Sequence, residues 1–274
     1  MSNKVIHSLK IRSIGLYLFI VFSSLALPVK AQVGENLLQE FDRQCQRAIQ
    51  APGGNLTQRT EYDLIQERSY ALPTQKRASF TGCDLRSADL RGADLSNADL
   101  SAVNFSPKTS VERAIVTEIP SDLTGANLSE SKLDYANFTR AILTNANLQG
   151  ARLYDTNLSG AQLANSRLDG VLAAYAILYE ANLAGATVTL GNLTSARMAG
   201  ANLSNTNFFQ AQLILADLRN VDLSNANLSE ANLSGANLTD ANLSGANLTG
   251  ANLAGANLCR TTLPNGTISQ AGCD

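Results

Sequence analysis

The feature that most constrains this chain is a five-residue word repeated in a single phase from Leu123 to Leu263. Leu or Phe occupies the centre of 26 of the 29 words in this block, and the stretch ANLSGANLTDANLSGANL at 231–248 hardly varies. Five residues advance an α-helix by about 500°, which would spread the central residues around every side. On a strand, an odd period places successive central residues on opposite faces. The chain must therefore turn a corner every five residues.

The other positions of the word suit such a corner. With the central residue called i, Ala fills i−2 in 20 of the 29 words, and Gly or Asn fills i+2 in 16. Gly tolerates the left-handed backbone of a tight turn best, and Asn is the next best residue there. We therefore expect i and i−2 to point inward, and i−1, i+1 and i+2 to face solvent.

The pattern A-(N/D)-L-(S/T)-x in tandem resembles the pentapeptide-repeat family over residues 78–105 and 121–265. The resemblance implies an all-β solenoid, a right-handed four-sided β-helix with four words per coil. Some members of that family mimic DNA and protect gyrase, a role that calls for a strongly acidic surface. Residues 121–265 carry 10 acidic and 7 basic side chains, which weighs against that role here.

The phase of the repeat breaks once. Phe105 and Leu123 are 18 residues apart, which is not a multiple of five, and Pro107 and Pro120 lie near the ends of the intervening segment 106–120. We expect an outward loop or a distorted corner, after which the same shaft resumes. Two separate rods are the alternative, and the short connection disfavours them.

The first 31 residues have the composition of a Sec-type signal peptide. Three basic residues precede an apolar run from Ile14 to Leu27, and small residues follow, which places cleavage after Ala31. An uncleaved anchor is the alternative, but the run is shorter than the roughly 20 residues of a spanning helix. We expect export to a periplasm, a thylakoid lumen or the extracellular space, with no membrane attachment after cleavage. Cleavage leaves 17 basic and 23 acidic residues, and this net charge of −6 does not suit nucleic acid.

Four cysteines in an exported chain predict two disulfides. Position along the chain favours Cys45–Cys83 and Cys259–Cys273. In region 32–77, an apolar stripe predicts an α-helix over 35–50, which would cap the first coil. A competing interpretation makes residues 35–75 a binding module. The tail 266–274, folded back by its disulfide, would close the other end.

The residue types of enzymes and metal sites are scarce. His7, the only histidine, lies in the signal peptide, so the mature chain has no imidazole for a Ser-His, Cys-His or zinc-histidine site. Asp84, Asp89, Asp94 and Asp99 have the five-residue spacing, so they would project from different sides and could not share one ion. We expect no enzymatic activity, no metal and no cofactor.

What remains is the surface of the shaft. Large apolar residues at outward positions gather on the side through Leu133, Leu153, Ala173, Leu193 and Leu213, and around its corner. They and a basic neighbour form a candidate protein-contact patch: Tyr135, Arg152, Tyr154, Leu172, Tyr175, Ile177, Tyr179, Ile214 and Leu215. We therefore expect a non-enzymatic scaffold that binds an unidentified protein or itself. The alternative is a glycan-binding or ice-binding surface, but the row Thr124, Thr144, Ala164, Ala184 loses its threonines after two coils.

Overall fold

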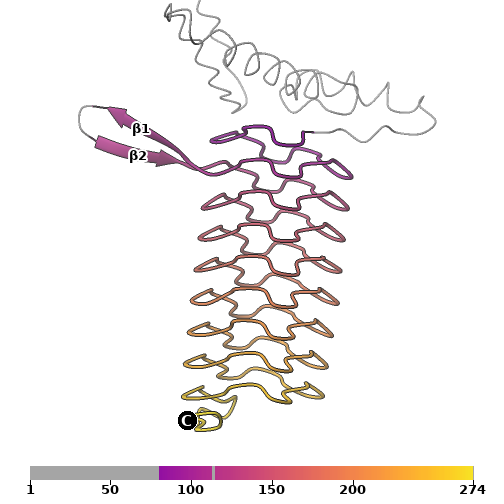
Figure 1. Ribbon diagram of the computed structural model, residues 1–274, viewed down its shortest axis with the longest axis vertical. Coiled ribbons are helices and arrows are strands. Elements are labelled where there is room, and N and C mark those ends of the chain that lie inside the picture. The colour runs from indigo at the N-terminus through magenta and orange to yellow at the C-terminus, as the bar shows by residue number, and fades with distance from the viewer. Residues whose placement is uncertain (1–79, 113–114, 274) are drawn as a thin grey trace, which may run out of the picture.

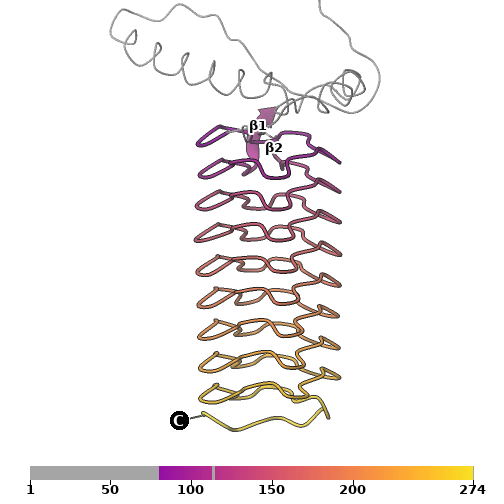
Figure 2. The same ribbon diagram turned by 90° about the vertical axis from the view of Figure 1, so that its right-hand side faces the viewer.

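The computed structural model describes residues 80–112 and 115–273, and the expected helix over 35–50 lies outside them. The described chain forms one straight shaft of stacked coils, from the indigo N-terminal coils to the yellow C-terminal end (Figures 1 and 2). Parallel bridges join residues that are 20 apart in sequence, such as Asp122–Ile142 and Ile142–Gln162. Each coil therefore contains four five-residue words, one on each side of the shaft. None of the described residues belongs to a helix long and apolar enough to cross a membrane.

The corners are tight turns with a left-handed residue at i+2, except the last, centred on Leu263, where Gly266 at i+3 has the positive φ. In the first word of the main block, the Ala126 N–H donates to the Leu123 carbonyl at 2.9 Å, and Gly125 between them has φ +67°. A positive φ at the third residue alone is typical of a type II turn. The same bond recurs in word after word, so the turn predicted from the five-residue period is the unit of the fold.

Backbone hydrogen bonds hold each coil to the next. The Leu123 N–H donates to the Ile142 carbonyl at 2.7 Å, and the Asn147 N–H donates to the Ala126 carbonyl at 2.9 Å. Asn at i−1 adds a second ladder, in which the Asn147 side-chain amide donates to Asn127 Oδ1 at 3.1 Å. Because Asn127 Oδ1 also accepts the Ser129 N–H, this side chain stabilises both the corner and the stack.

The core is a column of central residues lined by the small i−2 residues. Both sets are almost entirely buried up to the last coil, and the rings of Phe105 and Phe138 stack inside the column with their centroids 4.5 Å apart. Where Ser or Thr replaces Ala at i−2, the buried hydroxyl donates to a backbone carbonyl, as Thr156 does to Leu133 at 2.6 Å. No buried side-chain nitrogen or oxygen among the described residues lacks a hydrogen-bond partner, so the core tolerates these replacements.

The insertion at 106–120, expected as an outward loop or a distorted corner, contains a β-hairpin. Strand β1 (Lys108–Glu112) pairs antiparallel with β2 (Ile115–Ile119), and the hairpin projects sideways from the N-terminal part of the shaft (Figure 1). Its segments are rich in β-branched residues, which favour strands. Ser87 Oγ anchors the base by accepting the Lys108 N–H and donating to the Ile119 carbonyl. Bridges such as Asp89–Asp122 continue across the insertion, so one shaft resumes after it.

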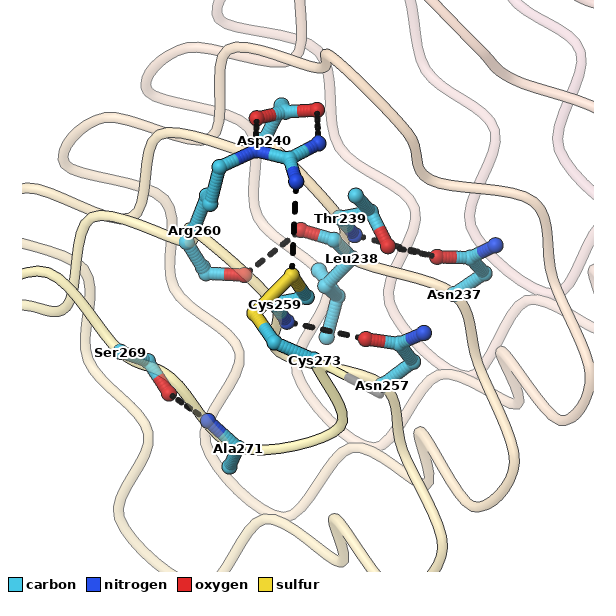
Figure 3. Close-up of a disulfide and its surroundings, with 11 residues drawn as sticks. Asn237, Leu238, Thr239, Asp240, Asn257, Cys259, Arg260, Ser269, Ala271 and Cys273 are labelled. Atoms are coloured by element: carbon cyan, nitrogen blue, oxygen red, sulfur yellow. Dashed lines mark hydrogen bonds and ion pairs between the residues drawn. A yellow bond between two sulfur atoms is a disulfide. The ribbon is translucent and has the colours of Figure 1, made fainter.

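The C-terminal tail folds back along two sides of the last coil. The Leu258 N–H donates to the Ala271 carbonyl, the Arg260 N–H donates to the Ser269 carbonyl, and the expected Cys259–Cys273 disulfide joins the tail to the coil (Figure 3). The other two sides of that coil contain Leu248 and Leu253, which are only half-buried. At the opposite end, Cys83 is disulfide-bonded, and its expected partner Cys45 lies outside the described residues.

Candidate protein-binding surface

Three tyrosines from successive coils form a ladder on one side of the shaft. The bridges Lys132–Arg152 and Arg152–Leu172 stack the words centred on Leu133, Leu153 and Ala173 directly upon one another. The ring of Tyr154 lies 5.7 Å from that of Tyr135 and 5.5 Å from that of Tyr175, and both contacts are edge-to-face. We call Tyr135, Tyr154 and Tyr175 the tyrosine ladder. Edge-to-face pairs at such distances are favourable, so the three rings form one pre-ordered surface.

The rings of the ladder remain open to solvent. Tyr135 is 60% exposed, Tyr154 42% and Tyr175 49%, and the neighbouring Leu172 is 51% exposed. A folded monomer gains little from exposing four large apolar side chains in one place, whereas a protein interface commonly centres on such residues.

Two ladder residues adopt a backbone conformation that stability alone would not select. Tyr135 and Tyr175 lie at i+2 corners with φ of +61° and +62°, and glycine fills 12 of the 33 described i+2 corners with positive φ. The left-handed conformation costs a non-glycine residue about 1–2 kcal/mol. Leu190 and Leu215 share this conformation and are also exposed. A bulky exposed residue at a strained position points to a use outside folding.

An ion pair between Asp134 and Arg152 lies beneath the ladder. Asp134 is buried although it occupies an i+1 position, which we expected to face solvent. Its carboxylate accepts the Tyr154 N–H at 3.2 Å and lies 3.0 Å from the Arg152 guanidinium. The next coil therefore covers and neutralises Asp134, so the surface above it behaves as a largely apolar one.

The remaining patch residues divide into two groups. Tyr179, around the corner, is exposed, whereas Ile177 and Ile214 are half-buried, so these two isoleucines offer less apolar surface than the tyrosines do. Leu215 is exposed but lies two coils beyond Tyr175, with the polar residues Asn192, Thr194 and Ser195 in the coil between. The contiguous part of the patch is thus the tyrosine ladder with Arg152 and Leu172.

The aspartates of the first coils each have a partner of their own. Asp89 lies against Arg91, Asp94 accepts the Asn127 side-chain amide, and Asp99 lies 3.3 Å from Lys132 Nζ. The hydrogen bonds from the Arg91 guanidinium hold the pKa of Asp89 below its usual value. No group of three or more His, Cys, Asp or Glu among residues 80–112 and 115–273 could hold a metal ion. Asp84, Asp89 and Asp99 thus form structural ion pairs with Arg86, Arg91 and Lys132.

Comparison with known proteins identifies the architecture. The family profile for pentapeptide repeats matches eight copies, over residues 76–106, 121–160, 151–189, 192–225 and 226–264. The chain belongs to the pentapeptide-repeat family. As a pentapeptide-repeat protein, it is a right-handed β-helix, and members of the family are generally non-enzymatic. A search of curated proteins gave no significant match.

Several solved pentapeptide-repeat structures are similar to this chain. HetL, a protein involved in heterocyst differentiation regulation from the cyanobacterium Nostoc sp. strain PCC 7120, is 31% identical, with 76% of this chain and 98% of HetL covered and a TM-score of 0.35. A protein of the Arabidopsis thaliana thylakoid lumen is 30% identical, with 38% of this chain and 70% of that protein covered and a TM-score of 0.29. QnrB1, a plasmid-mediated fluoroquinolone resistance protein, is 19% identical over 65% of this chain and 89% of its own, with a TM-score of 0.33, and that likeness concerns the fold alone.

Proposed function

We propose that this protein is a non-enzymatic, exported scaffold that binds a protein partner through the tyrosine ladder and Leu172. The observation that carries the proposal is the ladder itself, three exposed rings in edge-to-face contact, two of them at strained corners. Tyr is enriched at binding hot spots because it combines a large apolar surface with a polar hydroxyl. Rings that are already ordered lose little entropy when a partner docks.

Export is part of the proposal. The signal-like segment 1–31 supports it, and so does the Cys259–Cys273 disulfide, because disulfides persist in oxidising compartments. A thylakoid-lumen protein among the similar structures is consistent with an exported address. N-terminal sequencing of the protein recovered from its own cells checks this part, and a first residue other than Gln32 would contradict cleavage after Ala31.

The binding role is tested with two matched triple variants. The first, Tyr154→Ser, Leu172→Ser and Tyr175→Ser, removes apolar surface from the contiguous part of the patch. The second, Thr144→Ser, Gln162→Ser and Asn182→Ser, changes outward residues on the opposite side of the shaft. The words of that side are centred on Leu143, Leu163 and Leu183. Chemical cross-linking in the envelope fraction and light scattering of the purified chains measure partner capture and self-association. We expect loss in the first variant only, and equal capture and oligomeric state in all three proteins would refute the proposal.

A further inference from the structure

We propose that the tyrosine ladder and Asp155 together form a recognition site for a cationic side chain, the guanidinium of Arg or the ammonium of Lys, on the partner protein. This inference rests on the proposed binding role and adds the chemistry of what is bound. It depends on the placement of Asp155, on the absence of a counter-ion for its carboxylate among the described residues beside the ladder, and on the ring faces of the three tyrosines that the ladder leaves free.

Asp155 occupies the corner between two rings of the ladder. Tyr135, Asp155 and Tyr175 are the i+2 residues of three successive coils, all with positive φ, so their Cα atoms stack at the strand spacing of about 4.8 Å. Tyr154 is the residue before Asp155, and its ring lies against both other rings. The short aspartate leaves the space between Tyr135 and Tyr175 to the ring of Tyr154. The exposed Asp155 thus lies at the corner between Tyr135 and Tyr175 and directly follows Tyr154 in the chain.

The charges around the ladder leave this carboxylate uncompensated. Lys132 lies against Asp99, and Arg152 lies against Asp134, so both nearby cations are already paired. Among the described residues, none forms an ion pair with Asp155 or donates a hydrogen bond to its carboxylate. Lys132 and Arg152 carry two positive charges, and Asp99, Asp134 and Asp155 carry three negative ones, so the surface around the ladder has a net charge of −1. A ligand that supplies one positive charge would neutralise it.

The ring faces supply the second half of the site. Three rings have six faces, and two edge-to-face contacts can occupy at most two of them, so at least four are left free by the ladder itself. The face of an aromatic ring attracts a cation within about 6 Å of its centroid, and Arg is the usual partner in proteins. The flat guanidinium can lie on a tyrosine face while it donates hydrogen bonds to a carboxylate. An anionic or purely aliphatic ligand would use neither feature.

The test uses the intrinsic emission of tyrosine, because the chain has no tryptophan. The probe is an end-capped peptide, glycine–arginine–glycine–arginine–glycine, and its control replaces each arginine with neutral citrulline. We expect saturable binding of the arginine peptide to the mature chain, weakened by salt, and at least tenfold weaker binding of the citrulline peptide. Equal binding of the two peptides, or no saturable binding of the arginine peptide, would overturn the proposal.

Three variants assign the effect to the site. Asp155→Asn should weaken binding of the arginine peptide about tenfold without harming the fold, because Asn occupies the same corner in other words, such as Asn145 and Asn165. Tyr154→Leu should weaken it similarly by removing the central ring while keeping an apolar side chain. Glu230→Gln, an acidic corner on another side whose carboxylate accepts a hydrogen bond from the Gln210 side-chain amide, should bind as the unmodified chain does. Unchanged binding by Asp155→Asn would refute the role of the carboxylate.

The same variants separate this inference from the binding role on which it rests. If partner cross-linking is lost with Tyr154→Ser and Tyr175→Ser but survives in Asp155→Asn, the ladder binds a partner through apolar contact and the cation site is refuted. If none of these changes reduces cross-linking, the proposed function fails as well. Loss in both cases, together with the peptide result, supports both statements.

Discussion

The guanidinium of Arg152 lies 3.0 Å from the buried carboxylate of Asp134, and the two residues belong to successive coils. The Asp134 side chain is 9% exposed, whereas that of Arg152 is 54% exposed. The pair is therefore asymmetric: one charge is desolvated and depends on the other, which remains half in water. This relationship connects the stability of the shaft to the surface that we propose for binding.

Arg152→Gln should lower the free energy of unfolding by about 2 kcal/mol, because it leaves the Asp134 charge buried without its counter-ion. The urea midpoint at neutral pH measures the change. Arg219→Gln is the matched control, since Arg219 forms a similar pair with the more exposed Asp217. That change should cost less than about 1 kcal/mol, as exposed pairs contribute little. Equal losses in the two variants would contradict the special role of Asp134.

The regular part of the fold was predictable from the sequence, because each corner is decided within one five-residue word. Leu or Phe at i, Ala at i−2 and Gly or Asn at i+2 indicated the inward positions and the left-handed corner that the structure contains. The number of words per coil was not in the period itself and came from the resemblance to the pentapeptide-repeat family.

The site could be predicted only in outline, because it depends on contacts between residues 20 apart. The pattern located the tyrosines on one side, but the edge-to-face packing of Tyr154 and the burial of Asp134 arise when the next coil is added. For the same reason Ile177 and Ile214 become half-buried. The hairpin of β1 and β2 was also missed, because Arg113 and Ala114, between its two β-branched runs, lack the Gly, Asn or Asp that marks a two-residue hairpin turn.

Leu190→Asn should raise the free energy of unfolding by about 1 kcal/mol. Leu190 is 62% exposed at a corner with φ +59°, a conformation that Asn adopts at less cost. Denaturant midpoints measure the gain. Leu190→Ala is the control, because it also removes the exposed leucine side chain while Ala, like Leu, has no preference for a positive φ, and its midpoint should not rise. A gain in both variants would show that removing exposed apolar surface, and not relief of the backbone, is responsible.

Gly191→Ala should destabilise the protein by about 1–3 kcal/mol, the usual cost of overpacking a core. Gly191 occupies an i−2 position that is usually Ala, but its added Cβ would lie 2.8 Å from Val188 Cγ1 and 3.0 Å from the Val188 carbonyl oxygen. The Cβ-branched side chain of Val188 thus fills the space that an Ala side chain occupies at other i−2 positions. Thermal unfolding gives the size of the loss, and a variant as stable as the parent would show that the shaft adjusts without cost.

Asp217 should contribute to acid sensitivity. The hydrogen bonds from the Arg219 guanidinium hold the pKa of Asp217 below its usual value. The unfolded carboxyl, with a pKa near 4, binds protons more readily than the folded one, so the pair stabilises the fold above about pH 4. That contribution is lost as pH falls through the lower folded value. Urea midpoints from pH 7 to pH 2 should therefore fall less steeply below pH 4 in Arg219→Gln, and an unchanged slope would contradict this assignment.

The Cys259–Cys273 disulfide should protect the end of the shaft and not its middle. The cysteines are 14 residues apart, and closing a loop of this size stabilises by about 3 kcal/mol in the loop-entropy model. The loop contains only the last corners and the tail, so the double change Cys259→Ser and Cys273→Ser should loosen the amides of Leu258, Arg260 and Leu263, which donate to tail carbonyls. Hydrogen exchange at these amides should accelerate by up to about 100-fold, while Leu123 and Leu143 keep their protection. Faster exchange along the whole shaft would instead show that the coils unfold as one unit initiated at the C-terminal end.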